Sequence, residues 1–149
     1  MRFVLLHHTG WPGHSDHYDL MLQFAAGSSD DDAVLKTFAS VEDREPDGTP
    51  QRFQLINDHR RAYLAFEGAL SGQRGSVKRI DEGELLDAPD FSLTEIRFRL
   101  EGRRLKGSFV FRRESTDCAL CDDVREGRDA KLGDSPDSPV LVFTNHKRS

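Results

Sequence analysis

The chain has 149 residues, of which 36% are hydrophobic and 32% are charged, and its formal net charge is −5. This length favours one domain with a buried core, and the composition excludes a wholly disordered chain. No apolar run reaches the ~18 residues of a membrane-spanning helix, and the short apolar stretch before His7 is too brief for a secretory signal. We therefore expect a cytoplasmic monomer without membrane association.

Short β-rich segments follow one another through the first half of the chain. Residues 17–24 alternate between polar and apolar side chains, which is typical of a half-buried strand. Loops rich in Pro, Gly or acidic residues separate the segments at 9–16, 25–32 and 40–50. The predicted strands of this half are residues 3–8, 17–24, 34–38 and 62–66, whereas residues 53–56 are too short to assign.

The second half continues the pattern of strands and turns. A Gly-rich turn at 70–77 leads into a strand at 77–80. Residues 91–100 and 105–111 alternate and flank a Glu-Gly-Arg-Arg turn, which predicts a β-hairpin. Residues 140–144 predict a last strand at an edge of the sheet.

Many short strands, frequent turns and the absence of a long helical period predict an all-β fold. We expect a compact antiparallel β-barrel of short strands, with at most a minor helix. The barrel is predicted to span residues 1–113. Residues 114–149 are expected to form an acidic, flexible tail that contains the last strand.

Charge is distributed unevenly over the C-terminal half. Residues 94–113 hold seven basic and two acidic residues, whereas residues 114–138 hold three basic and eight acidic ones. A basic hairpin can bind a polyanion, or it can simply be a solvated face. Cys118 and Cys121 lack the further ligands of a structural zinc site, so we interpret them as two thiols in a loop.

Two histidines and an aspartate carry the strongest chemical signal. His17 and Asp19 project from the same face of one predicted strand, because alternate residues share a face. His8 ends the preceding strand and can reach the same point across a hairpin. Two imidazoles and a carboxylate can hold a catalytic divalent metal such as zinc, iron or manganese. On residue pattern alone, solvated side chains on a polar strand face are the alternative.

Four spaced motifs resemble the 3′-phosphoesterase domain of bacterial DNA ligase D, in the same order. They are residues 3–8 with His17-Tyr18-Asp19-Leu20-Met21-Leu22, then Asp58-His59-Arg60-Arg61-Ala62-Tyr63 with Phe66-Glu67-Gly68, the Gly-rich turn at 72–77, and the closing Leu-Glu-Gly-Arg-Arg-Leu-Lys-Gly hairpin. The resemblance covers roughly residues 3–113.

The resemblance implies a role for each matching residue. His8, His17 and Asp19 match the family's metal ligands, usually for Mn²⁺, with Zn²⁺ as the alternative. His59 matches a histidine that contacts the reacting phosphate, and Tyr63 matches a tyrosine of the same site. A metal polarises a phosphoryl oxygen, and a histidine can transfer a proton near neutral pH. The implied partners are DNA or RNA 3′ ends and, beyond them, the ligase or polymerase proteins of DNA repair.

The sequence also departs from the family. Met21 stands where the family has a phosphate-binding arginine, and methionine donates no hydrogen bond. Thr9 replaces an aspartate, and the longer loop between the first two ligands adds His14, which we consider as an accessory ligand. Other basic residues in or beside the matching segments can replace the lost arginine: Arg52, Arg61 and Arg74.

Three functions are compatible with these residues. The first is a metal-dependent phosphoesterase that removes 3′-phosphates or 3′-ribonucleotides from DNA or RNA ends during repair. The second is a binding module for nucleic-acid ends that keeps the metal but has lost turnover, which Met21 favours. The third is a small-molecule metalloenzyme on a cupin-like barrel, although a cupin usually shows a closer His-x-His pair.

Overall fold

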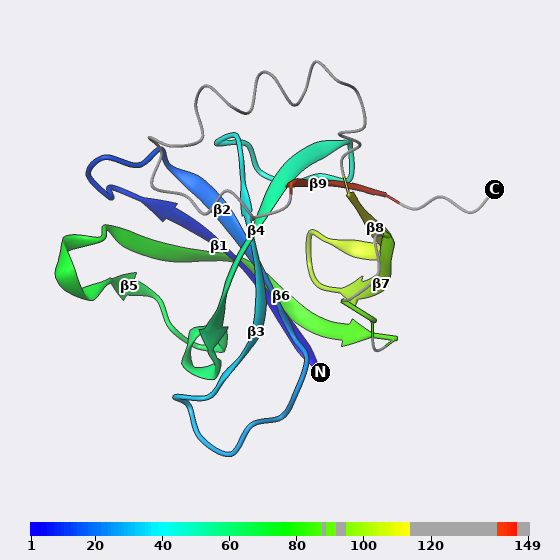
Figure 1. The fold of residues 1–149 in the computed structure, drawn as a ribbon, viewed down its shortest axis with the longest axis horizontal. Coiled ribbons are helices and arrows are strands. Elements are labelled where there is room, and N and C mark those ends of the chain that lie inside the picture. The colour runs from blue at the N-terminus through cyan, green and yellow to red at the C-terminus, as the bar shows by residue number, and fades with distance from the viewer. Residues whose placement is uncertain (88, 92–94, 114–139, 146–149) are drawn as a thin grey trace.

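The polypeptide forms one antiparallel β-sheet that closes on itself (Figure 1). The structure, a computed structural model, describes residues 1–87, 89–91, 95–113 and 140–145. Within these residues eight strands follow the order β1-β2-β3-β4-β9-β8-β7-β6, and β6 pairs again with β1 to complete a barrel. The predicted all-β antiparallel barrel is confirmed. The strands are β1 (Arg2–Thr9), β2 (His17–Gln23), β3 (Ala33–Ser40), β4 (Gln51–Arg60), β5 (Gly68–Ala69), β6 (Ser76–Leu86), β7 (Glu95–Glu101), β8 (Lys106–Arg113) and β9 (Val140–Asn145).

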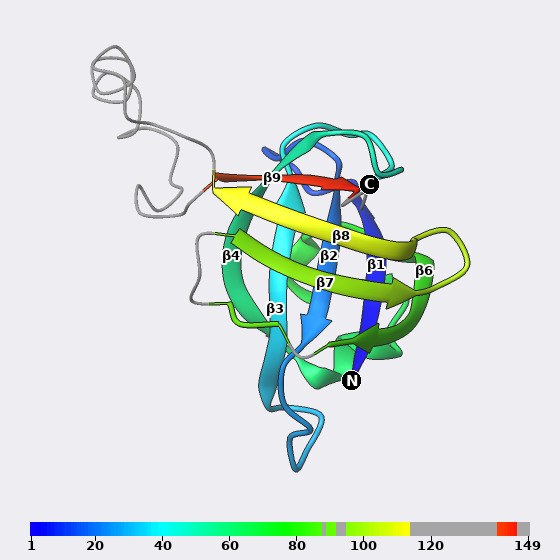
Figure 2. The same cartoon turned by 90° about the vertical axis from the view of Figure 1, so that its right-hand side faces the viewer.

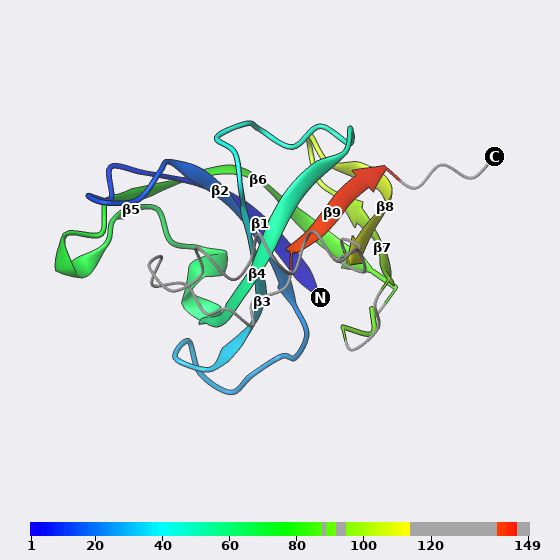
Figure 3. The same cartoon turned by 45° about the horizontal axis from the view of Figure 1, so that its top comes forward.

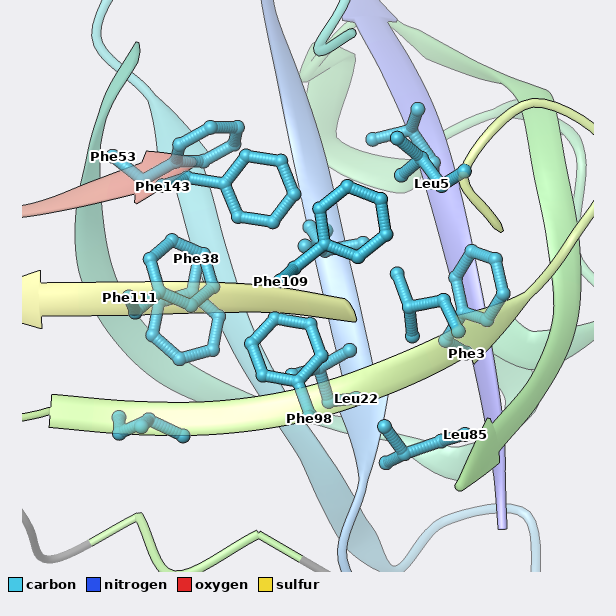
Figure 4. Packing of buried hydrophobic residues seen from close by; sticks show 14 of the residues in the cluster. Phe3, Leu5, Leu22, Phe38, Phe53, Leu85, Phe98, Phe109, Phe111 and Phe143 are labelled. Carbon is cyan, nitrogen blue, oxygen red and sulfur yellow. The ribbon is translucent and has the colours of Figure 1, made fainter. Parts of the chain in front are cut away.

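Alternate residues of each strand point into the barrel. Many of these inward residues are aromatic. On β7 the inward residues are Ile96, Phe98 and Leu100, while the charged residues between them face outward. Two rings stack closely: Phe38 on Phe111, with centroids 4.1 Å apart. Figure 4 shows these rings gathered in one cluster inside the barrel. The phenylalanines of this inner core are Phe3, Phe38, Phe53, Phe98, Phe109, Phe111 and Phe143.

Strand β9 lies between β4 and β8, with antiparallel pairing on both sides (Figure 2). The expectation of an edge strand is therefore wrong. Leu141 and Phe143 point into the core, and the backbone of β9 satisfies the edges of both neighbours. The barrel thus includes a strand from beyond residue 113. The acidic segment at 114–139, with Cys118 and Cys121, lies outside the described residues.

The segment predicted as a strand at 62–66 is instead a short 3-10 helix, η1 (Arg61–Leu64). Its backbone donors find carbonyl partners in the loop before β3, since Arg61 donates to Asp32 and Ala62 donates to Asp30. A neighbouring strand is therefore not needed to satisfy them. The only buried side chain of η1 is that of Tyr63, which anchors the helix to the barrel.

A second apolar layer covers the outer face of β1 and β2. Phe3 and Leu5 point into the barrel, whereas Val4 and Leu6 point outward and are also fully buried. The cover consists of η1, β5 and a second 3-10 turn, η2 (Ser71–Gln73). Figures 1 and 3 place this cover on the side of β1 away from β7, β8 and β9. This outer layer comprises Val4, Leu6, Met21, Val34, Leu35, Tyr63 and Val77, with Leu64, Phe66 and Leu70 packed against it.

The turn between β7 and β8 is fixed by the buried carboxylate of Asp81 in β6. It accepts hydrogen bonds from the backbone N–H groups of Arg103, Arg104 and Leu105 at 2.8 to 2.9 Å. A Cβ on Gly102 would lie 2.5 Å from the Phe3 ring, so only glycine fits beside this contact. The network attaches the predicted hairpin to the closed barrel. No helix in the described residues has the length and apolar character to cross a membrane.

Candidate metal centre

His8, His17 and Asp19 converge on the outer face of the β1–β2 hairpin. His8 at the end of β1 pairs directly with His17 at the start of β2, and Asp19 follows two residues later on the same face. One ligand atom from each of the three lies within 4.8 Å of the others. The register of a single hairpin therefore brings together the three residues that the sequence singled out as metal ligands.

Backbone carbonyls fix the orientation of both imidazoles. Nε2 of His8 lies 2.6 Å from the carbonyl of Arg74, and Nδ1 of His17 lies 2.9 Å from the carbonyl of Ser15. A carbonyl only accepts, so each of these nitrogens carries the proton in the neutral ring. The other nitrogen of each ring faces Asp19, at 3.6 Å for His8 and 3.3 Å for His17. Metal-binding histidines typically have this second hydrogen bond.

Asp19 is the most deeply buried member of the group, with 3% of its surface exposed. Its Oδ1 atom is buried and has no hydrogen-bond partner among the described residues. A buried carboxylate oxygen without a partner costs free energy unless a cation compensates it. The orphaned oxygen and the two oriented imidazoles fit a divalent metal, and the mixed nitrogen and oxygen donors suit Mn²⁺, Zn²⁺ or Fe²⁺.

Burial and neighbouring groups act in opposite directions on the pKa values of His17 and Asp19. Burial works to lower the pKa of His17, but the adjacent Asp19 carboxylate outweighs it, so the pKa is raised above 6.5. Burial works to raise the pKa of Asp19, but the imidazoles of His17 and His8 outweigh it, and the pKa is lowered. The Asp19 carboxylate therefore favours the protonated form of His17. A divalent ion would replace that proton.

Trp11 covers the centre from the loop between β1 and β2. Its ring is stacked on His8, with centroids 5.2 Å apart, and on His14, with centroids 3.7 Å apart. Trp11 therefore contacts a residue of the candidate centre directly. His14 is not part of the group of ligand atoms. His7 points the other way, as strand alternation predicts, and pairs with Asp43 at 2.8 Å.

His59 and Tyr63 contact each other, with ring centroids 5.3 Å apart. His59 ends β4, where its Nδ1 lies 2.8 Å from the carbonyl of Asn57. Within the described part of the chain, no hydrogen bond or ring contact joins His59 to the three ligands. Tyr63 packs in the outer layer with Met21, which lies two residues beyond Asp19 on the same strand face. Tyr63 thus belongs to the same apolar layer as a residue of the strand that carries Asp19.

The three candidate arginines occupy different environments. Arg61 is held by Asp30 at 3.2 Å and by the carbonyl of Ala26 at 3.0 Å, so its donors tie η1 to a loop. Arg52 is exposed on β4, seven residues before His59, or on the order of 20 Å along the strand. Arg74 alone of the three adjoins the metal centre, because its carbonyl accepts from His8.

A pocket of about 240 Å³ opens between η1, β5 and η2. Tyr63 and Phe66 form aromatic walls, and Arg60 and Arg74 contribute guanidinium groups. The pocket therefore contains one predicted catalytic residue and one candidate phosphate ligand. Sequence reasoning did not find it, because its walls come from short irregular segments.

Four of the seven basic residues of the hairpin form ion pairs. Glu95 pairs with both Arg97 and Arg112, Arg99 pairs with Asp87, and Arg104 pairs with Glu45. These contacts give the outer face of β7 and β8 mixed charge, so the structure offers little support for a continuous polyanion surface there.

A comparison with family models finds none that matches this chain, and a comparison with curated protein sequences finds no match. The functional assignment therefore depends on the geometry of the candidate metal centre and of the residues around it.

Proposed function

We propose that this protein is a metal-dependent phosphoesterase that acts on the 3′ ends of DNA or RNA. The observation that carries the proposal is the group of His8, His17 and Asp19, with two imidazoles oriented by carbonyls and a carboxylate oxygen that lacks a partner. The sequence resemblance to the ligase D phosphoesterase family supports the choice of phosphate ester as substrate and of Mn²⁺ as metal. A role in DNA repair follows from the same resemblance.

The reaction is hydrolysis of a phosphate monoester. Water attacks phosphorus, the bond from phosphorus to O3′ breaks, and O3′ takes up a proton as it leaves. When bound by His8, His17 and Asp19, the metal supplies charge that polarises a phosphoryl oxygen and acidifies a water molecule.

The chain's own side chains bind and orient the substrate. Asp19 holds the cation and remains ionised, since its pKa is lowered. Arg74 donates from its guanidinium to a phosphate oxygen, which is the contact that Met21 does not make. The Tyr63 hydroxyl, which has no hydrogen-bond partner among the described residues, orients an oxygen of the ester. His59 transfers a proton between the site and the solvent.

Release of inorganic phosphate from a primer-template whose 3′-phosphorylated terminal nucleotide is unpaired tests the proposal. We expect release with Mn²⁺ that is lost with EDTA and in His17→Ala. His14→Ala is the matched control, because His14 lies in the same loop region but outside the ligand group, and it should keep activity. Mn²⁺ binding is followed by quenching of Trp11, the only tryptophan of the chain, which is stacked on His8.

A second candidate function is a binding module for 3′ ends that holds the metal without turnover. Met21 favours this second function. An arginine at this position would bring a charge to the phosphate, whereas the Met21 side chain is 1% exposed and packs in the outer layer. Mn²⁺ binding and 3′-end binding without phosphate release would support this second function. Absence of Mn²⁺ binding would contradict both.

A further inference from the structure

The pocket between η1, β5 and η2 has a surface suited to a flat ring. Its aromatic walls, Tyr63 and Phe66, meet edge to face with centroids 5.8 Å apart, and Leu70 adds an aliphatic surface. The pocket is smaller than the ~300–1,000 Å³ of most sites for drug-sized ligands. It therefore has room for one small ring system. Rings of every nucleobase can stack on such walls.

The pocket also carries positive charge. The Arg74 guanidinium is held in place by the carbonyl and the hydroxyl of Ser71, at 2.8 and 3.2 Å. Both partners are neutral, and no carboxylate among the described residues pairs with it. The Arg60 guanidinium lies 5.9 Å above the Tyr63 ring and also contacts Asp31. A ligand with a ring and an adjacent anion complements this combination.

Arg74 connects the pocket to the metal centre. Its side chain lines the pocket, and its carbonyl accepts the hydrogen bond from His8. Tyr63 is related to both sites as well, because it lines the pocket and shares the outer layer with Met21, two residues beyond Asp19. A ligand that reaches from one site to the other needs a ring at one end and a phosphate at the other.

We propose that this pocket binds the terminal base of an unpaired 3′ end, while the 3′-phosphate of the same nucleotide lies toward His8, His17 and Asp19. The proposal rests on the proposed phosphoesterase function and adds a specificity to it. A 3′ end with a base is preferred over an abasic 3′ end, and the terminal nucleotide must be unpaired to reach the walls.

The test compares binding of two labelled single-stranded tetranucleotides with EDTA, so that no metal-dependent turnover occurs. One ends in thymidine 3′-phosphate, and the other ends in an abasic tetrahydrofuran residue with the same phosphate. Stacking of one base predicts roughly tenfold tighter binding of the first. Ala69→Leu, at an exposed residue that lines the pocket, should remove this preference. Ala33→Leu, at an exposed residue of β3 outside the pocket, should keep it.

Each other outcome has a defined meaning. Equal binding of both tetranucleotides, or binding of neither, would overturn the pocket proposal. Thymidine 3′-monophosphate that binds as tightly as the tetranucleotide would overturn recognition of a strand end and assign the pocket to a free nucleotide. Phosphate release with Mn²⁺ is measured separately on both tetranucleotides. Release without base preference removes the pocket proposal alone, and base preference without release removes the phosphoesterase proposal alone.

Discussion

The inner core and the outer layer share strands β1 and β2 but differ in what they contain. The inner core holds seven buried phenylalanines in a closed space. The outer layer is mainly aliphatic, is covered by two short helical turns, and borders the candidate metal centre and the pocket. Because successive residues of a strand point to opposite faces, one stretch of sequence serves both regions. The inner face determines the fold, and the outer face positions the polar groups.

Removal of β9 should have the largest effect on the inner core. A chain that ends at residue 139 lacks Leu141 and Phe143 of the inner core and leaves unpaired edges on β4 and β8. We expect loss of the cooperative fold and aggregation, measured by near-ultraviolet circular dichroism and size-exclusion chromatography. Val142→Thr on the full chain is the control and should remain folded. A folded, monomeric truncated chain would show that the barrel is stable without β9.

Phe111→Ala should weaken the inner core and leave the outer layer intact. Phe111 is fully buried and contacts the rings of Phe38, Phe53 and Phe98. Truncation of a buried phenylalanine lowers the free energy of unfolding by about 3–5 kcal/mol. Urea denaturation measures this loss, and Mn²⁺ affinity of the folded protein should be unchanged. A parallel loss of Mn²⁺ affinity would mean that the two faces are mechanically coupled.

Asp19→Asn makes the opposite change, at the outer face. The variant removes the negative ligand, so Mn²⁺ affinity should fall by at least about the 100-fold that loss of a supporting residue can cost. Its stability without metal should also fall, by about 1–3 kcal/mol, because the neutral amide no longer pairs with the imidazoles of His8 and His17 in this buried position. Titration of Trp11 fluorescence and urea denaturation give the two values. Unchanged Mn²⁺ affinity would disprove the site.

The smallest expected effect is the pH dependence of the metal-free protein. The lowered pKa of Asp19 stabilises the fold above its ordinary value of 3.8, and the raised pKa of His17 stabilises it below 6.5. Both contributions are complete between these values. Stability should fall as the pH rises through the raised pKa of His17, because the folded state then loses the proton that the Asp19 carboxylate stabilises. Urea midpoints in EDTA measure it, and His17→Ala should lack the decline.

Alternation of side chains made most of the barrel predictable. Residues 95–101 and 106–113 alternate around a Gly-containing turn, and the structure forms β7 and β8 there. The strand predicted at 62–66 failed because strand propensity is local, whereas the carbonyls of Asp30 and Asp32 that fix η1 come from a distant loop. The position of β9 depends on the free edges of β4 and β8, which a local pattern does not encode.

Some residues of the candidate site could likewise be grouped from the sequence, and others could not. His17 and Asp19 could be grouped from their spacing, and His8 from the expected hairpin. The stack of Trp11 on His8 depends on the path of a loop, and the neighbourhood of Tyr63 and Arg74 depends on how η1 and η2 fold over the outer face. Spacing along one hairpin is a property of the sequence. A wall made from three separate segments is a property of the tertiary structure.

The location of β9 has a consequence for the order of events during protein synthesis. The ribosome releases β9 last among the described strands, yet β9 pairs with β4, which emerged long before. Until residue 145 has left the ribosome, the edges of β4 and β8 have no partner. Pairings between residues so distant in sequence also form slowly. We therefore expect the nascent chain to need chaperones or slow translation in order to fold correctly. The finished barrel, whose strand edges are paired, should not need them.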